Sequence, residues 1–111
     1  METTRQQKIA RLIQKDLGTI FQQSAGTYGG AMITVTKVYV TGDLSIAKVY
    51  LSIFAAKEKE AVIGLVRNHT RDIRHNLGTL ERNQLRVIPD LQFFEDDSLD
   101  YIENIDKLLK G

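Results

Sequence analysis

The sequence contains no cysteine and no tryptophan, and it has a single proline. Without cysteine, neither a disulfide framework nor a thiolate metal site can form. No apolar run reaches the roughly 18 residues that a membrane helix needs. The N-terminal METTRQQK also lacks the apolar stretch of a signal peptide. We therefore expect a cytoplasmic protein that does not insert into a membrane.

The composition is that of an ordinary globular domain. Of the 111 residues, 42% are hydrophobic and 26% are charged, which is far from a disordered or collagen-like composition. A chain of this length can bury one core but is too short for two. We expect one domain spanning residues 1–111 and, since nothing indicates an obligate dimer, a monomer.

Charge is unevenly distributed along the chain. Residues 1–94 contain 13 Lys or Arg and 8 Asp or Glu, whereas residues 95–111 contain 2 and 6. The body is therefore basic and the tail acidic. This asymmetry permits nucleic-acid binding by one surface but does not prove it.

Apolar residues recur at helical spacing from residue 4 to residue 22, which predicts an amphipathic helix. They are Ile9, Leu12, Ile13, Leu17, Ile20 and Phe21. One flank of the apolar stripe carries the cations Arg5, Lys8, Arg11 and Lys15. This flank is either a phosphate-binding ridge or a solvated helix face. Gly18, unfavourable in a helix interior, suggests that another backbone passes close by.

The glycine-rich SAGTYGG at 24–30 ends this helix. It contains GTYG, formally the G-x-x-G with which KH domains clamp single-stranded RNA. In KH domains that loop joins two helices, whereas this one lies between a helix and a strand and has no basic neighbour. We interpret it as a flexible connection.

Two strands follow, in AMITVTKVYVT and SIAKVYLSIF. The second alternates between apolar Ala47, Val49, Leu51 and Ile53 on one face and Lys48, Tyr50 and Ser52 on the other. The short TGDLS between the strands predicts an antiparallel hairpin. In the first strand the apolar phase slips, which predicts a bulge near Thr36 and Lys37.

The next segment predicts two short helices that meet at a kink. Their apolar positions are Val62, Leu65 and Val66 in the first, and Ile73, Leu77 and Leu80 in the second. The kink is Asn68-His69-Thr70, where Thr70 is expected to cap the second helix and Asp72 to complement its dipole. Arg67, Arg71 and Arg74 flank this corner.

A third strand is expected in LRVIPDLQFF, at a sheet edge or with a bulge because of Pro89. DDSLDYIENIDKLLKG then predicts a C-terminal helix. Four acidic residues near its start, Glu95, Asp96, Asp97 and Asp100, suit the helix N-terminus better than a metal site. The predicted order is α-β-β-α-α-β plus a C-terminal helix, an α+β fold with helices on one sheet face.

Several blocks of this chain closely resemble the bacterial ribosome-binding factor A family. They are VTKVYVTGDLSIAKVYLSIF, IRHNLG and LRVIPDLQFFEDDSLDYIENI, and the N-terminal helix with its basic flank also matches. The resemblance covers nearly the whole chain and implies a type II KH fold. The family has an Ala-x-Gly kink in place of the G-x-x-G loop, and here Asn68-His69-Thr70 stands at the kink. Many members also carry a proline where this chain has Gly42, and a basic loop where it has AGTYGG.

What the resemblance implies is a cytoplasmic assembly factor. Such a factor binds the free small (30S) ribosomal subunit, assists late maturation and processing of the 16S rRNA, and supports growth in the cold. It is not an enzyme and needs no cofactor.

We expect the rRNA to bind two basic surfaces through its phosphates. The candidate residues are Arg5, Lys8, Arg11, Lys15, Lys48, Arg67, Arg71, Arg74, Arg82 and Arg86. The sequence shows no exposed aromatic platform, so base recognition is expected to be poor. Charge reversal at Arg71 and Arg74 is expected to weaken subunit binding without unfolding the domain.

Three other functions remain open. The first is a KH protein that reads the sequence of single-stranded RNA. The second is a small hydrolase built on His69, His75 and Asp72, although these histidines lack the usual catalytic companions, and their spacing of six argues against a shared metal site. The third is a protein-interaction module that uses the acidic tail.

Overall fold

The first helix, α1 (Thr4–Gln23), begins at a capping box. The Thr3 hydroxyl accepts a hydrogen bond from the Gln6 backbone N–H (3.1 Å), and the Gln6 side chain accepts one from the Thr3 N–H (2.8 Å). Gln6 also donates to the Val40 carbonyl (2.8 Å), so the residue that caps the helix also fixes it to a strand. The predicted helix over residues 4–22 is confirmed.

A computed structural model describes residues 3–54, 58–82, 84–85 and 87–96 of the chain. After α1 come a short 3₁₀ helix, two strands, two helices and a third strand. Their bounds are η1 (Ala25–Tyr28), β1 (Met32–Val40), β2 (Ile46–Phe54), α2 (Lys59–Asn68), α3 (Thr70–Glu81) and β3 (Asp90–Glu95). The predicted C-terminal helix lies outside the described residues.

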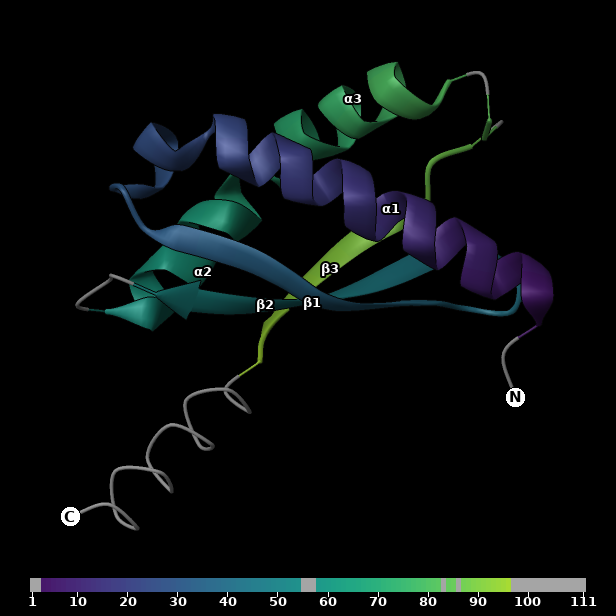
Figure 1. The fold of residues 1–111 in the computed structure, drawn as a ribbon, viewed down its shortest axis with the longest axis horizontal. Helices are drawn as coiled ribbons and strands as arrows, with labels where there is room; N and C mark the ends of the chain where they lie inside the picture. The colour runs from purple at the N-terminus through teal and green to yellow at the C-terminus, as the bar shows by residue number, and fades with distance from the viewer. Residues whose placement is uncertain (1–2, 55–57, 83, 86, 97–111) are drawn as a thin grey trace, which may run out of the picture.

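The strands form one sheet in the order β1-β2-β3, in which β2 pairs antiparallel with β1 and parallel with β3. The hairpin is confirmed, and so is the bulge, because the β1–β2 register shifts between Val35 and Lys37. β3 lies at a sheet edge and begins just after Pro89, which has no N–H to donate to a ladder. Figure 1 shows α1 lying across the sheet beside α3.

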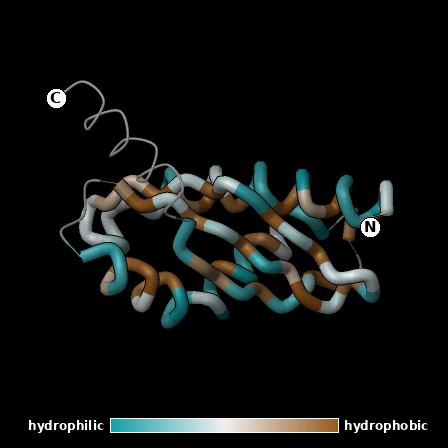
Figure 2. Tube along the Cα trace, turned by 90° about the horizontal axis from the view of Figure 1, so that it is seen from below, coloured by the Kyte–Doolittle hydropathy of each residue, from teal (hydrophilic) through white to brown (hydrophobic). Residues whose placement is uncertain are grey.

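One face of the sheet is buried by the helices, and no helix among the described residues covers the other, which we call the open face. On β2 the inward residues Ala47, Val49, Leu51 and Ile53 are at most 1% exposed. They pack against fully buried side chains such as Ile13 and Leu17 of α1 and Leu77 of α3. Figure 2 shows the matching alternation of hydrophobic and hydrophilic residues along the strands. This is the helix-on-one-face α+β arrangement that the element order predicts.

Ser52 departs from the predicted alternation, because it is buried although it belongs to the outward set. β2 is the central strand, so Ser52 has a neighbouring chain on each side, with Thr34 of β1 as its cross-strand partner.

The buried side of α3 also differs from its prediction. Leu80 is 50% exposed and Glu81 is fully buried, because the row that faces the core runs Ile73, Leu77, Glu81 at intervals of four. Leu65 of α2 is 37% exposed in the same way. The apolar pattern was sound for the middle of each helix and wrong at these positions.

Glu81 accepts no hydrogen bond from any described residue. Burial, and to a smaller extent the neighbouring Asp16, raise the pKa of its carboxyl to about 8. At neutral pH the Glu81 carboxyl is therefore protonated, on the side of α3 that faces the core. The core-facing side of α3 therefore contains one buried carboxyl that is neutral at pH 7.

Candidate nucleic-acid interface

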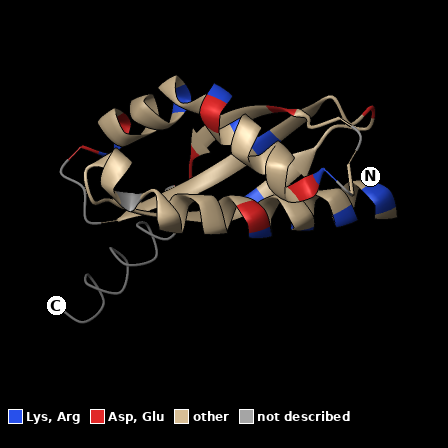
Figure 3. Ribbon diagram, turned by 90° about the horizontal axis from the view of Figure 1, so that it is seen from above, with Lys and Arg blue, Asp and Glu red and all other residues tan. Residues whose placement is uncertain are grey.

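The four predicted cations of α1 are all exposed: Arg5, Lys8, Arg11 and Lys15. We call this set the α1 ridge. Its direction follows from the anchored side of the helix, where Gln6 and Gln14 donate to the Val40 and Val35 carbonyls of β1. At about 100° per residue, the ridge then points away from the sheet. Figure 3 shows the blue segments recurring along α1.

The corner between α2 and α3 consists of a single residue. His69 has φ −100° and ψ 11°, and its Nδ1 lies 2.8 Å from the Leu65 carbonyl oxygen. A carbonyl only accepts, so Nδ1 carries the proton. The Thr70 hydroxyl donates to the Arg67 carbonyl (2.8 Å). The kink is thus closed by two side chains that satisfy the last carbonyls of α2.

The prediction that Thr70 caps α3 was wrong. Thr70 is the first residue of α3 and its hydroxyl donates backwards, while the N-cap position belongs to His69, whose side chain makes no capping hydrogen bond. Asp72 does lie in the first turn of α3, as predicted. The N-terminus of α3 therefore has its dipole but no side-chain cap, which suits an anion.

A surface cleft of about 710 Å³ lies at this corner. We call it the α2–α3 cleft. Its lining residues are Arg67, Asn68, Thr70, Arg71, Arg74, His75 and Ile88. The fold therefore brings together the three arginines that the sequence placed around the kink. A concave site with three guanidinium groups and a helix N-terminus is complementary to a phosphate.

Two of these arginines also hold β3 in place. Arg67 donates twice to the Phe93 carbonyl, at 2.8 and 3.2 Å. Arg74 donates to the Ile88 carbonyl (2.6 Å) and the Pro89 carbonyl (3.3 Å), and its guanidinium lies 3.7 Å from the Asp90 carboxylate. Reversal of Arg74 should therefore also cost stability, and the expectation that it leaves the domain folded stays a prediction.

Arg71 differs from its two neighbours. It is exposed, and it makes no hydrogen bond or ion pair with the part of the chain that the structure describes. None of its five N–H donors is used by the described part of the fold. Arg71 is therefore the cation of the α2–α3 cleft that a ligand can engage without competing with β3.

The remaining candidate cations lie apart from these two surfaces. Lys48 is half-buried on the open face of the sheet, and Arg82 is exposed at the C-terminal end of α3. Arg86 lies outside the described residues. The sequence predicted the residue types of the basic surface, but it did not predict this separation.

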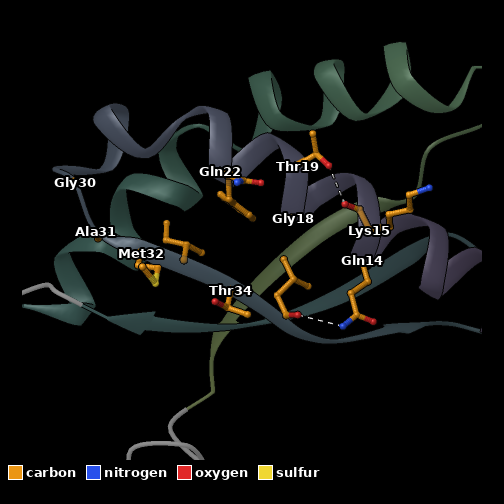
Figure 4. A pocket seen from close by; sticks show the side chains of 12 residues that line it. Gln14, Lys15, Gly18, Thr19, Gln22, Gly30, Ala31, Met32 and Thr34 are labelled. Atoms are coloured by element: carbon orange, nitrogen blue, oxygen red, sulfur yellow. Dashed lines mark hydrogen bonds between the residues drawn. The ribbon is translucent and has the colours of Figure 1, made fainter.

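A second cleft, of about 730 Å³, lies between the C-terminal half of α1 and the start of β1. Lys15 of the α1 ridge lines it, and Gly18 faces it from the helix (Figure 4). A Cβ on Gly18 would meet nothing within 4 Å. The inference that another backbone passes close to Gly18 was therefore wrong, since open space lies there.

The two histidines have different surroundings. The His69 ring packs edge-on against Tyr28, with ring centroids 5.8 Å apart, while His75 is exposed in the α2–α3 cleft. Over residues 3–96, apart from the few not described, no three side chains are grouped so as to hold a metal ion. In that same part of the chain, no helix is long and apolar enough to cross a bilayer.

Only half of the predicted acidic cluster can be placed. Asp97 and Asp100 lie outside the described residues, and Glu95 ends β3. The Asp96 carboxylate accepts a hydrogen bond from Thr36 (2.6 Å), and its N–H donates to the Leu51 carbonyl. Asp96 therefore connects the end of β3 to the bulge of β1.

Sequence analysis missed a pair of aromatic residues on the open face of the sheet. The Tyr50 and Phe94 rings stack, with centroids 5.5 Å apart and planes at 29°. Both rings are half-buried, and the expectation that no aromatic platform is exposed to bases stays a prediction. These residues lie 44 positions apart, and only the parallel β2–β3 register brings them together, so no local pattern could have shown it.

Comparison with known proteins gives one consistent result. The profile described as "Ribosome-binding factor A" matches residues 5–109. This chain belongs to the ribosome-binding factor A family. Ribosome-binding factor A of Christiangramia forsetii is 50% identical over 99% of this chain and 86% of its own length. That of Flavobacterium johnsoniae is 49% identical over 100% of this chain and 87% of its own length.

Solved structures of the family share the fold. Ribosome-binding factor A from Thermus thermophilus superposes with a TM-score of 0.68, at 21% identity, over 81% of this chain and 94% of that one. A homology model of the Thermus thermophilus factor, fitted into a cryo-electron microscopy map of a 30S complex, gives 0.61 at 19% identity, covering 79% and 91%. The type II KH-like fold of the ribosome-binding factor A family is thus confirmed, with α2-His69-α3 as its helix-kink-helix.

Proposed function

We propose that this ribosome-binding factor A family member binds the free small (30S) ribosomal subunit through its rRNA. Bound there, it assists late maturation and processing of the 16S rRNA, including in the cold. The observation that carries the proposal is the convergence of Arg67, Arg71 and Arg74 at the uncapped N-terminus of α3. The Thermus factor fitted into a map of a 30S complex supports the choice of subunit.

The proposed contacts are mainly with phosphates. Arg71 supplies a guanidinium that has no partner among the described residues, and Arg67 and Arg74 add positive charge while they hold β3. The α1 ridge supplies four more cations on a second surface. Lys48, Arg82 and Arg86 are weaker candidates. Contacts of this kind fix the position of an RNA without reading its sequence.

The proposed mechanism is selection of a conformation. A protein that binds one rRNA conformation more tightly than another shifts the population toward the first, by no more than its difference in affinity. The factor would hold an immature conformation until maturation removes it. In this account residues 1–111 act in the cytoplasm as one monomeric domain, without a cofactor, a membrane or a catalytic step.

Co-sedimentation of the purified protein tests the proposal. It is spun with free small subunits, with complete ribosomes and with bulk RNA, over a series of salt concentrations. We expect retention on free subunits but not on complete ribosomes, with an affinity that falls as salt rises. Equal retention on all three would reduce the protein to a general basic RNA binder, and retention on none would refute the proposal.

A further inference from the structure

The open face of the sheet carries two neighbouring rows of side chains. The β1–β2 and β2–β3 registers align one row across the three strands and a second row two residues away. The rows are Lys37–Tyr50–Phe94 and Tyr39–Lys48–Gln92. Residues paired across strands point to the same face, and the intervening Val38, Val49 and Phe93 are buried. Both rows therefore face away from α1, α2 and α3.

The chemistry of these rows differs from that of an ordinary solvated sheet face. Each row places a lysine beside an aromatic ring, and the carboxylate beside the first row, that of Asp96, accepts a hydrogen bond from Thr36. Tyr39, Tyr50 and Phe94 are half-buried, and Tyr50 and Phe94 stack on each other. A cross-strand aromatic pair alone would serve sheet stability. Alternating rings and cations also match the alternating bases and phosphates of single-stranded RNA.

The sheet face is continuous with the α1 ridge at the β1 edge. Arg11 of the ridge and Lys37 of the first row line one cleft at the seam between α1 and β1. Gln14 lines the same cleft and donates to the Val35 carbonyl of the bulge. This hydrogen bond holds α1 against β1. A polyanion bound to the α1 ridge and extending toward β1 would therefore reach Lys37 first.

At the β3 edge the sheet face is continuous with the α2–α3 cleft. Gln92 and Phe94 line a smaller cleft of about 410 Å³ together with Arg67 and Thr70. Arg67 and Thr70 also line the α2–α3 cleft. The open sheet face thus lies between the two basic surfaces of the proposed function and connects them.

We propose that the open face of the sheet binds unpaired rRNA bases. Tyr50 and Phe94 stack against the bases, and Lys37 and Lys48 hold the adjoining phosphates. This inference rests on the proposed function in one respect only, namely that RNA is the ligand. It adds a contact with bases to an interface otherwise made with phosphates, along one path from the α1 ridge to the α2–α3 cleft.

The test uses unstructured RNA oligonucleotides of about ten nucleotides, a length that one stacking surface engages. Binding of oligo(A) and oligo(U) is compared with binding of an abasic oligonucleotide of the same length. The variant Tyr50→Leu/Phe94→Leu removes both rings and keeps apolar bulk. Phe54→Leu is the matched control, because Phe54 lies on the same strand and face but outside the two rows.

We expect the double variant to bind oligo(A) about tenfold more weakly than the unaltered protein, the usual effect of losing a stacking ring. Phe54→Leu and binding of the abasic RNA should change little. In the unaltered protein, aromatic NMR signals of Tyr50 and Phe94 should shift on saturation with oligo(A). The NMR measurement decides the matter even where the double variant fails to fold.

Two results would overturn the inference: equal affinity for abasic and ordinary RNA, or ring signals that do not move at saturation. The second result would show that the two rings do not contact RNA. Subunit co-sedimentation separates this failure from failure of the proposed function. Retention on free small subunits with unmoved ring signals refutes only the sheet-face site, whereas loss of all RNA and subunit binding refutes both.

Discussion

Glu81 links the stability of this domain to pH. Its pKa lies near 8 in the folded protein and near 4.5 when unperturbed, so between these values the unfolded chain releases a proton that the folded chain keeps. The free energy of unfolding should therefore fall as pH rises through this window, by up to about 1.4 kcal/mol per pH unit. Below the window the contribution is constant, and above it the loss is complete. Urea unfolding from pH 5 to pH 9 measures this slope.

The variant Glu81→Gln isolates the cause. The amide cannot ionise, so the fall in stability should largely disappear and the variant should exceed the unaltered protein at pH 8. Glu60→Gln, at an exposed position in the first turn of α2, is the matched control and should keep the slope. An unchanged slope in Glu81→Gln would show that this carboxyl is ionised when folded.

Gln6 has two structural tasks at one end of α1. Gln6→Ala removes half of the capping box and leaves the buried Val40 carbonyl without its donor, which should cost about 1–3 kcal/mol. Gln6→Glu preserves the box but offers Val40 no amide donor, so it should also destabilise at neutral pH. Gln7→Ala, at an exposed neighbouring position, serves as the control. If chemical denaturation gives Gln6→Glu the same free energy of unfolding as the control, the hydrogen bond from Gln6 to Val40 does not stabilise the fold.

At the scale of the elements, the α2–α3 corner separates structure from binding. Arg74→Gln removes two hydrogen bonds to the segment that enters β3. Because this side chain is half-exposed, the variant should lower the free energy of unfolding by about 1 kcal/mol. Arg71→Gln removes no contact with the described residues and should leave the melting temperature unchanged. Thermal unfolding of both variants tests the division. Equal losses in both would mean that Arg71 is also structural.

The sequence predicts most elements of this fold because periodicity is local information. The apolar spacing was sufficient to predict α1, and the slip in the apolar alternation was sufficient to predict the bulge between Val35 and Lys37. Burial of Glu81 and the backward donation of Thr70 depend on which helix packs opposite. They cannot be derived from one segment.

The candidate site divides in the same way. The sequence identified the cations of the α1 ridge and the corner, because these lie on single helices or across one kink. The Tyr50–Phe94 pair and the use of Arg67 and Arg74 by β3 arise from contacts between distant segments. Sheet register and a folded corner are needed to see them.

At the scale of the whole molecule, binding to rRNA should depend on the number of cations engaged. Neutralising one ridge cation with Lys8→Gln should lower the slope of log affinity against log salt by about one, without altering stability. Filter binding to small-subunit rRNA over a salt series measures the slope. If the slope is the same in Lys8→Gln, the α1 ridge does not contact phosphate.

The most direct test of the account is the dissociation constant of Arg71→Glu for free small ribosomal subunits. Arg71 lines the α2–α3 cleft and has no structural partner among the described residues, so reversal changes the proposed phosphate contact and little else. We predict a folded protein whose affinity is at least about tenfold lower, the effect of losing a charge-assisted contact. A folded Arg71→Glu protein that binds as tightly as the unaltered one would contradict the central claim that this cleft binds rRNA.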